Sequence, residues 1–169
     1  MRVLLFIPFV FSLAFSQSSY ALKSVYTYQL ARFTNWSELE CESRRKTFNI
    51  GVYADNEQYK YFTAMAGKQI NSKRVSLTRI DNIEDIKGCD IHLLFIGKDK
   101  EEFLPALKDF PIMTVSDIDN FTQKGGIVWL NFNNKGPKIY INMHNAKKRK
   151  IKFSSRLLEI AVLHNGDHR

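Results

Sequence analysis

The chain has little cysteine, proline or glycine, and it lacks the common motifs of enzyme sites. It holds two cysteines, four prolines and eight glycines in 169 residues. No internal repeat, low-complexity block or proline- and glycine-rich linker occurs, so a second domain is not expected. The phosphate-binding patterns Gly-x-Gly-x-x-Gly and Gly-x-x-x-x-Gly-Lys-[Ser/Thr] are missing, and so is Cys-x-x-Cys. The four histidines, His92, His144, His164 and His168, do not have the spacing of metal ligands. We therefore expect no catalytic residues, no metal and no cofactor.

Long apolar runs are also scarce, and the one at the N-terminus is short. Arg2 precedes an apolar stretch over residues 3–15, which is followed by small and polar residues up to Ala21. This is the pattern of a secretory signal peptide. About 13 residues are too few to span a hydrocarbon layer of roughly 30 Å, although a retained membrane anchor is the alternative. We predict a signal peptide over 1–21 and one exported domain over 22–169.

Positive charge is in excess. The formal net charge is +8, and removing Arg2 leaves +7 for the exported domain. Export argues against nucleic acid as the binding partner. The excess of positive charge therefore favours an acidic protein, an anionic membrane face or an anionic small molecule as the partner. The densest run is Lys147-Lys148-Arg149-Lys150, which is either a solvated loop or a partner contact.

The order of apolar patterns predicts alternating helices and strands. Helical patterns cover 23–36, 56–65, 83–87, 100–108 and 156–164, and strand patterns cover 48–52, 75–77, 91–96, 111–115, 127–132 and 138–143. The last two strands are separated by a five-residue hairpin loop at 133–137. The predicted fold class is α/β: a single-domain sandwich with a mixed β-sheet flanked by helices, ending in a hairpin and a helix.

Several segments, in order, resemble the YfiR family. They are LARFTNW at 30–36, FNIGV at 48–52, INSKRV at 70–75, CDIHLLFI at 89–96, PIMTVSD at 111–117, GGIV at 125–128, IYIN at 139–142 and FSSRLL at 153–158. The resemblance implies a bacterial periplasmic protein, usually a homodimer, that performs no chemistry. It implies repression of a YfiN-like inner-membrane diguanylate cyclase through its periplasmic sensor domain, with a YfiB-like outer-membrane lipoprotein as a further partner. The output would be cyclic-di-GMP and biofilm regulation.

The cysteines fit this family only in part. An even number of cysteines in an exported protein suggests a disulfide, here Cys41 with Cys89, and two unpaired thiols are the alternative. Cys89 stands where the family places a disulfide partner, whereas Cys41 precedes the first strand and lies off the usual position. The family's usual proline after tryptophan is replaced by Ser37.

A partner surface and a ligand pocket are the two candidate sites. Aromatic and basic residues dominate interface energetics, which nominates Trp36, Lys147, Lys148, Arg149 and Lys150, with Tyr26, Tyr28 and Tyr140 as further aromatics. The alternative is that most of these aromatics belong to the core.

The candidate pocket would bind an anionic metabolite, and it supports a second function, that of a small-ligand sensor. It consists of Ser116, Asp117, Gly125, Gly126 and Arg156. A structural ion pair between Arg156 and Asp117 is the simpler alternative. A hydrolase is the least favoured function because no nucleophile and base are paired.

Overall fold

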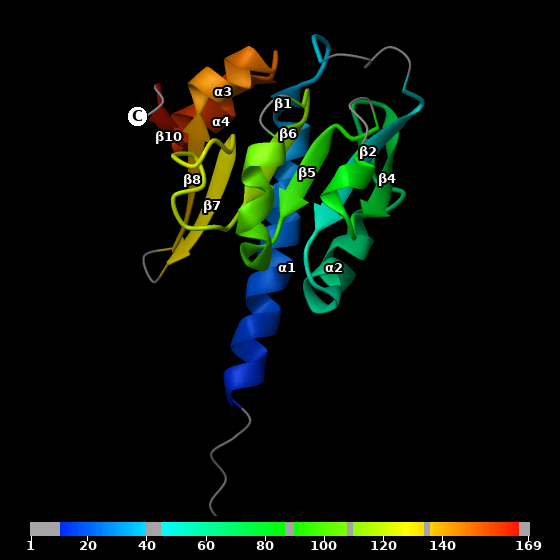
Figure 1. Cartoon of the computed structure of the whole chain (residues 1–169), viewed down its shortest axis with the longest axis vertical. Helices are drawn as coiled ribbons and strands as arrows, with labels where there is room; N and C mark the ends of the chain where they lie inside the picture. The colour runs from blue at the N-terminus through cyan, green and yellow to red at the C-terminus, as the bar shows by residue number, and fades with distance from the viewer. Residues whose placement is uncertain (1–10, 40–44, 87–89, 108–109, 134–135, 166–169) are drawn as a thin grey trace, which may run out of the picture.

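One eight-stranded mixed sheet organises the molecule (Figure 1). The computed structural model describes residues 11–39, 45–86, 90–107, 110–133 and 136–165. Its helices are α1 (Phe11–Arg32), α2 (Asn56–Phe62), α3 (Met143–Lys148) and α4 (Ser155–Ile160), with 3₁₀ segments η2 (Thr63–Met65), η3 (Ile83–Asp85) and η4 (Lys98–Leu107). Its strands are β1 (Thr34–Asn35), β2 (Thr47–Tyr53), β3 (Gln69–Ile70), β4 (Lys73–Arg79), β5 (Leu93–Ile96), β6 (Met113–Ser116), β7 (Val128–Asn133), β8 (Gly136–Asn142), β9 (Lys152–Phe153) and β10 (Val162–His164).

The sheet is parallel at its centre and contains two antiparallel pairs, β3 with β4 and β7 with β8. Its strand order is β10-β8-β7-β6-β5-β2-β4-β3, with β2 paired in parallel to both β4 and β5. The parallel run continues through β6 to β7, after which β8 is antiparallel to β7 and β10 is parallel to β8. A separate two-stranded ladder joins β1 to β9. The predicted α/β class with a mixed sheet is confirmed.

Both faces of the sheet are buried, which explains the unbroken apolar run in β5. Leu93 and Phe95 enter one cluster, with residues of α1, α2 and α4. Leu94 and Ile96 enter the other, with residues of η3 and of the segment that follows β6. Successive side chains of a strand point to opposite faces, so a strand covered on both sides must be apolar at every position.

The C-terminal segment differs from its prediction. The predicted helix at 156–164 ends at Ile160, and Val162 to His164 form β10, which pairs with Tyr140 to Asn142 of β8. Ala161 is already extended, with φ −91° and ψ 152°. The strand forms because β8 would otherwise leave a row of unpaired backbone groups at the sheet edge.

Two shorter segments also differ. Asn133 pairs with Gly136, so two residues separate β7 from β8 instead of the predicted five. Gly136 has φ +97°, a conformation that glycine adopts without steric cost. The first two lysines of the basic run, Lys147 and Lys148, end helix α3 and are not in a loop.

The N-terminal helix passes through the predicted processing point without a break. Helix α1 covers Phe11–Arg32, so Ala21 and Leu22 lie inside it. None of the helices in the described part of the chain combines the length and hydropathy needed to cross a membrane. Cys41 and Cys89 lie outside the described residues, and the predicted disulfide stays a prediction.

Candidate partner-binding groove

Ser116 and Asp117, from the predicted ligand pocket, lie at the carboxyl end of β6. The Ser116 hydroxyl is fully buried, donates to the Ile96 carbonyl at 2.6 Å and accepts from the Ile118 amide at 3.0 Å. It therefore joins the ends of β5 and β6. Asp117 Oδ2 lies 2.7 Å from Lys23 Nζ of α1, and both side chains are almost buried. The ion-pair partner of Asp117 is thus Lys23 and not Arg156.

The other three pocket residues lie elsewhere. Gly125 and Gly126 precede β7, and because Val128 pairs with Val115, Gly126 lies level with the start of β6. Arg156 is exposed on α4, whose N-cap residue Ser154 donates its amide to the Phe33 carbonyl at 2.8 Å. Phe33 is about 15 Å along the helix direction from Lys23. The five residues therefore occupy both ends of the sheet, and the structure does not bring them together.

Of the predicted partner surface, the lysines are exposed but Trp36 and Arg149 are not. Trp36 is 1% exposed, and its Nε1 donates to the Ala31 carbonyl at 2.8 Å. Arg149 is buried, with Nη1 3.5 Å from the Ile112 carbonyl and from Thr114 Oγ1. The structure corrects the prediction for these two residues, because a buried side chain cannot contact a partner without unfolding its surroundings. The remaining residues, Lys147, Lys148 and Lys150, are exposed.

The aromatic candidates are partly buried. Tyr26 and Tyr28 pack against the cluster beneath α1, and Tyr140 packs against the cluster on the opposite face. Tyr26 meets the Phe132 ring edge to face at 5.6 Å, and the Tyr28 hydroxyl donates to the Gln69 carbonyl at 3.0 Å. These contacts give the tyrosines structural roles.

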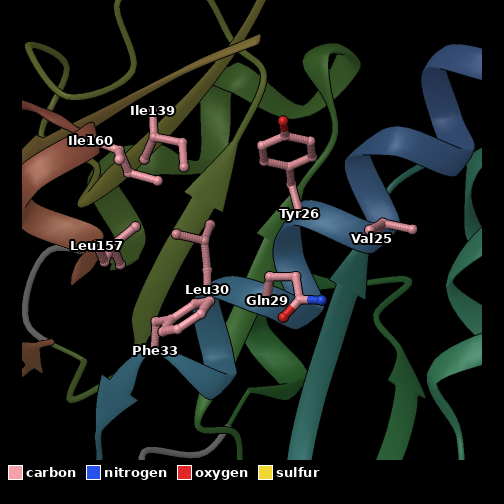
Figure 2. A pocket seen from close by; sticks show the side chains of 8 residues that line it. All are labelled: Val25, Tyr26, Gln29, Leu30, Phe33, Ile139, Leu157 and Ile160. Atoms are coloured by element: carbon pink, nitrogen blue, oxygen red, sulfur yellow. The ribbon is translucent and has the colours of Figure 1, made fainter.

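An apolar groove lies between α1 and α4 (Figure 2). Its volume is about 270 Å³, and Figure 2 shows Leu157 and Ile160 of α4 across from Leu30 of α1 and from Phe33, which follows α1 directly. We call this surface the α1–α4 groove, and its lining residues are Val25, Tyr26, Gln29, Leu30, Phe33, Ile139, Leu157 and Ile160. Gln29 is the one polar residue among them.

The groove is unusually exposed for an apolar surface. Ile160 is 72% exposed, Val25 53% and Phe33 39%. The chain then enters β10, where Val162 and Leu163 are also large, apolar and exposed. Contiguous exposed apolar surface on a folded domain commonly marks an interaction site.

Few charged residues adjoin the groove residues in sequence. Arg156 and Glu159, both exposed, adjoin Leu157 and Ile160, respectively. The Arg32 guanidinium lies near the Tyr28 ring, whose hydroxyl donates to Gln69 of β3 at the other edge of the sheet. The excess positive charge of the whole chain favours a partner with acidic residues. No cluster of His, Cys, Asp or Glu able to hold a metal occurs among the residues described.

The groove was not predicted from the sequence, because the first helix was predicted over 23–36 without assigning its faces. Val25, Gln29 and Phe33 recur every fourth residue, and Tyr26 and Leu30 follow the same interval beside them. Such spacing predicts a stripe along a helix. The signal for a second, unburied stripe was therefore present, but the opposite wall, α4, came from a segment predicted as one longer helix.

The fold and the groove define an α/β domain with an open apolar surface suited to binding another molecule. The chain belongs to the YfiR/HmsC-like family, whose model matches residues 20–162. A solved structure of similar fold is a conserved domain protein from Vibrio cholerae O1 biovar El Tor, with a TM-score of 0.56 and 12% identity. The match covers 85% of this chain and 60% of that protein, so this chain spans less than two thirds of its length. No curated protein matches the chain.

The family's proteins are regulators rather than enzymes, and the family suggests a periplasmic regulator of cyclic-di-GMP signalling.

Proposed function

We propose that this protein is a periplasmic repressor that binds the sensor domain of an inner-membrane, YfiN-like diguanylate cyclase and so lowers cyclic-di-GMP signalling. The predicted signal peptide at 1–21 would deliver the domain 22–169 to the periplasm. Family membership supports the signalling role, and the α1–α4 groove is the observation that supports binding through this surface.

The groove has the properties of a site for an amphipathic segment. Peptide recognition by an apolar groove depends on a few apolar anchors that enter it in a row. Burying a fully exposed aliphatic side chain contributes roughly 1.5–3 kcal/mol, so covering Ile160 at 72% exposure contributes about 1–2 kcal/mol. Val25 and Phe33 add further area.

Repression requires a difference between two states of the sensor. If the inactive state presents the anchoring segment and the active state withdraws it, the repressor stabilises the inactive state by the lost contact. A preference of about 1.4 kcal/mol changes the ratio of the states tenfold, which is about the contribution of Ile160 alone.

A binding experiment with the isolated sensor domain of the cyclase tests this proposal. The wild type is expected to bind at micromolar concentration or better. Ile160→Asp and Val25→Asp should each raise the Kd at least tenfold, because a carboxylate would lose its hydration in an apolar contact. Ala64→Asp, at an exposed position on η2, is the control for added charge and should bind like the wild type.

Two results would count against the proposal. Absence of any complex at micromolar concentrations would reject the cyclase sensor as the partner. A complex that tolerates both groove substitutions, with folded variants, would place the contact on another surface.

Three finer proposals follow: family membership supports the first two, and the even number of cysteines supports the third. We propose that the protein is a homodimer, that a YfiB-like outer-membrane lipoprotein is a second partner, and that Cys41 and Cys89 form a disulfide. Light scattering, binding to the purified lipoprotein and thiol titration under non-reducing denaturation test them in turn. A monomer, no binding, or two free thiols would reject the respective statement.

A further inference from the structure

Asp117 is a nearly buried carboxylate with one oxygen unused. Its Oδ2 meets Lys23 Nζ at 2.7 Å, while its Oδ1 is buried and has no hydrogen-bond partner. The Lys23 and Asp117 side chains are 10% and 11% exposed. A buried acceptor without a partner is costly, more so when it carries charge. The structure of the unprocessed chain therefore leaves a strong acceptor unsatisfied at this point.

The acceptor lies at the predicted processing point. Lys23 is the second residue after Ala21, and the Tyr20 ring lies 4.8 Å from Lys23 Nζ. The Ser24 hydroxyl donates to the Ala21 carbonyl at 2.8 Å. Removal of residues 1–21 would take away both the Tyr20 ring and this carbonyl. It would also leave the first amides of the shortened α1 without their helical acceptors.

Processing would also create a new positive charge beside Asp117. The freed α-amino group of Leu22 has an ordinary pKa near 8 and is mostly an ammonium at neutral pH. Side chains on a helix slant toward its N-terminus, so the carboxylate held by Lys23 lies toward the new helix start. An ammonium at that end of a helix is normally unfavourable, because it opposes the helix dipole, whereas a carboxylate there is favourable.

We propose that Asp117 is the acceptor of the mature N-terminal ammonium. Oδ1 of Asp117 would bind the α-amino group of Leu22 while Oδ2 keeps Lys23. The carboxylate then anchors the start of α1, the helix that forms one wall of the groove, to the end of β6. This inference rests on the predicted signal peptide and is independent of the cyclase proposal.

The test compares two chemical forms of the protein purified from the periplasm after expression of the full chain. Intact mass first establishes whether the chain begins at Leu22. One portion is then acetylated selectively at its α-amino group, which is less basic than the lysines. Removing the charge usually stabilises a helix start. Here we expect the opposite: acetylation should lower the Tm by about 2–4 °C, which corresponds to about 1 kcal/mol for a domain of this size.

Variants attribute the effect to Asp117. In Asp117→Asn, acetylation should leave the Tm unchanged or raise it. Asp119→Asn should lose Tm on acetylation as the wild type does, because Asp119 is 68% exposed and pairs with Lys98. If Asp117→Asn does not fold, Lys23→Gln serves instead, because it keeps the carboxylate and should retain the full loss on acetylation. A chain that does not begin at Leu22, a wild type stabilised by acetylation, or a Lys23→Gln variant without the loss would each overturn the proposal.

Discussion

Replacing Gly126 by alanine should destabilise the protein strongly, for a purely steric reason. A Cβ at this position would lie 2.1 Å from two ring carbons of Phe121 and 2.6 Å from a third. Phe121 is fully buried, and its carbonyl accepts the Gly126 amide at 3.0 Å, which holds the two backbones together. Overpacking of a core costs roughly 1–3 kcal/mol. Because the overlap involves a ring that cannot move outward, we expect about 3 kcal/mol.

The preceding glycine provides a matched comparison. Gly125 has φ +96°, and no atom lies within 4 Å of the position that its Cβ would take. Gly125→Ala should therefore cost only the backbone strain of a positive φ, about 1–2 kcal/mol. Two adjacent glycines are thus needed for different reasons, one for conformation and one for space.

Urea unfolding of single and double variants separates the two reasons. Phe121→Leu alone should cost about 1–2 kcal/mol from the cavity that it leaves. Combined with Gly126→Ala it should relieve the overlap, so that the double variant is at least 1 kcal/mol more stable than the sum predicts. Combined with Gly125→Ala it should be additive. Two results would refute the steric argument. One is a free energy of unfolding for Gly126→Ala within about 0.5 kcal/mol of the wild type, which is the usual effect of a surface substitution. The other is strict additivity of Gly126→Ala with Phe121→Leu.

Two further predictions concern buried aromatic side chains. Trp36→Phe should destabilise the fold by about 1–3 kcal/mol, because the Ala31 carbonyl loses its hydrogen bond from the indole N–H. The folded variant should bind the cyclase sensor domain as the wild type does. Weaker binding by a fully folded variant would show that Trp36 contributes to the interface. Burial raises the pKa of Tyr53, so the folded state holds the phenolic proton more tightly than the unfolded chain does. The stability that results is complete below about pH 10, the ordinary tyrosine pKa, and is lost as the pH rises through the pKa of the folded state. Tyr53→Phe should lack this part of the alkaline loss, and chemical denaturation between pH 8 and 11, a range spanning roughly the ordinary tyrosine pKa, measures it; identical profiles would contradict the assignment.

The sheet could be predicted well because its strands are buried on both faces. Residues 91–96 and 111–117 are apolar or small at nearly every position, and only a strand inside a sheet is covered on both sides. The hairpin could be predicted because a glycine and a proline lie between two apolar strand patterns. The length of its loop could not be predicted, because asparagine at position 133 is as acceptable at the end of a strand as in a turn.

The C-terminal strand could not be predicted from local pattern. Residues 156–164 are mostly apolar and contain no glycine or proline, which suits a helix as well as a strand. What ends α4 at Ile160 is the free edge of β8, a partner more than twenty residues earlier in the chain. Tertiary pairing of this kind overrides local propensity.

The candidate site residues were chosen by chemical type, and their burial decided where they belong. Trp36 and Arg149 are residue types that are common in interfaces, but here they are buried and donate hydrogen bonds to backbone carbonyls of the core. The partner of Asp117, Lys23, lies 94 positions earlier in the printed sequence. No local spacing connects such residues. Asp117 was nominated as a ligand-pocket residue, with an ion pair to Arg156 as the alternative, and the structure pairs it with Lys23 instead.

The two walls of the α1–α4 groove come from opposite ends of the polypeptide, with a central sheet between them. Because synthesis proceeds from the N-terminus, α1 is made early, but the groove is complete only after α4 has been made. Truncated or stalled molecules would lack one side of the cleft. Completion of the chain through α4 is thus a precondition for any binding through this groove.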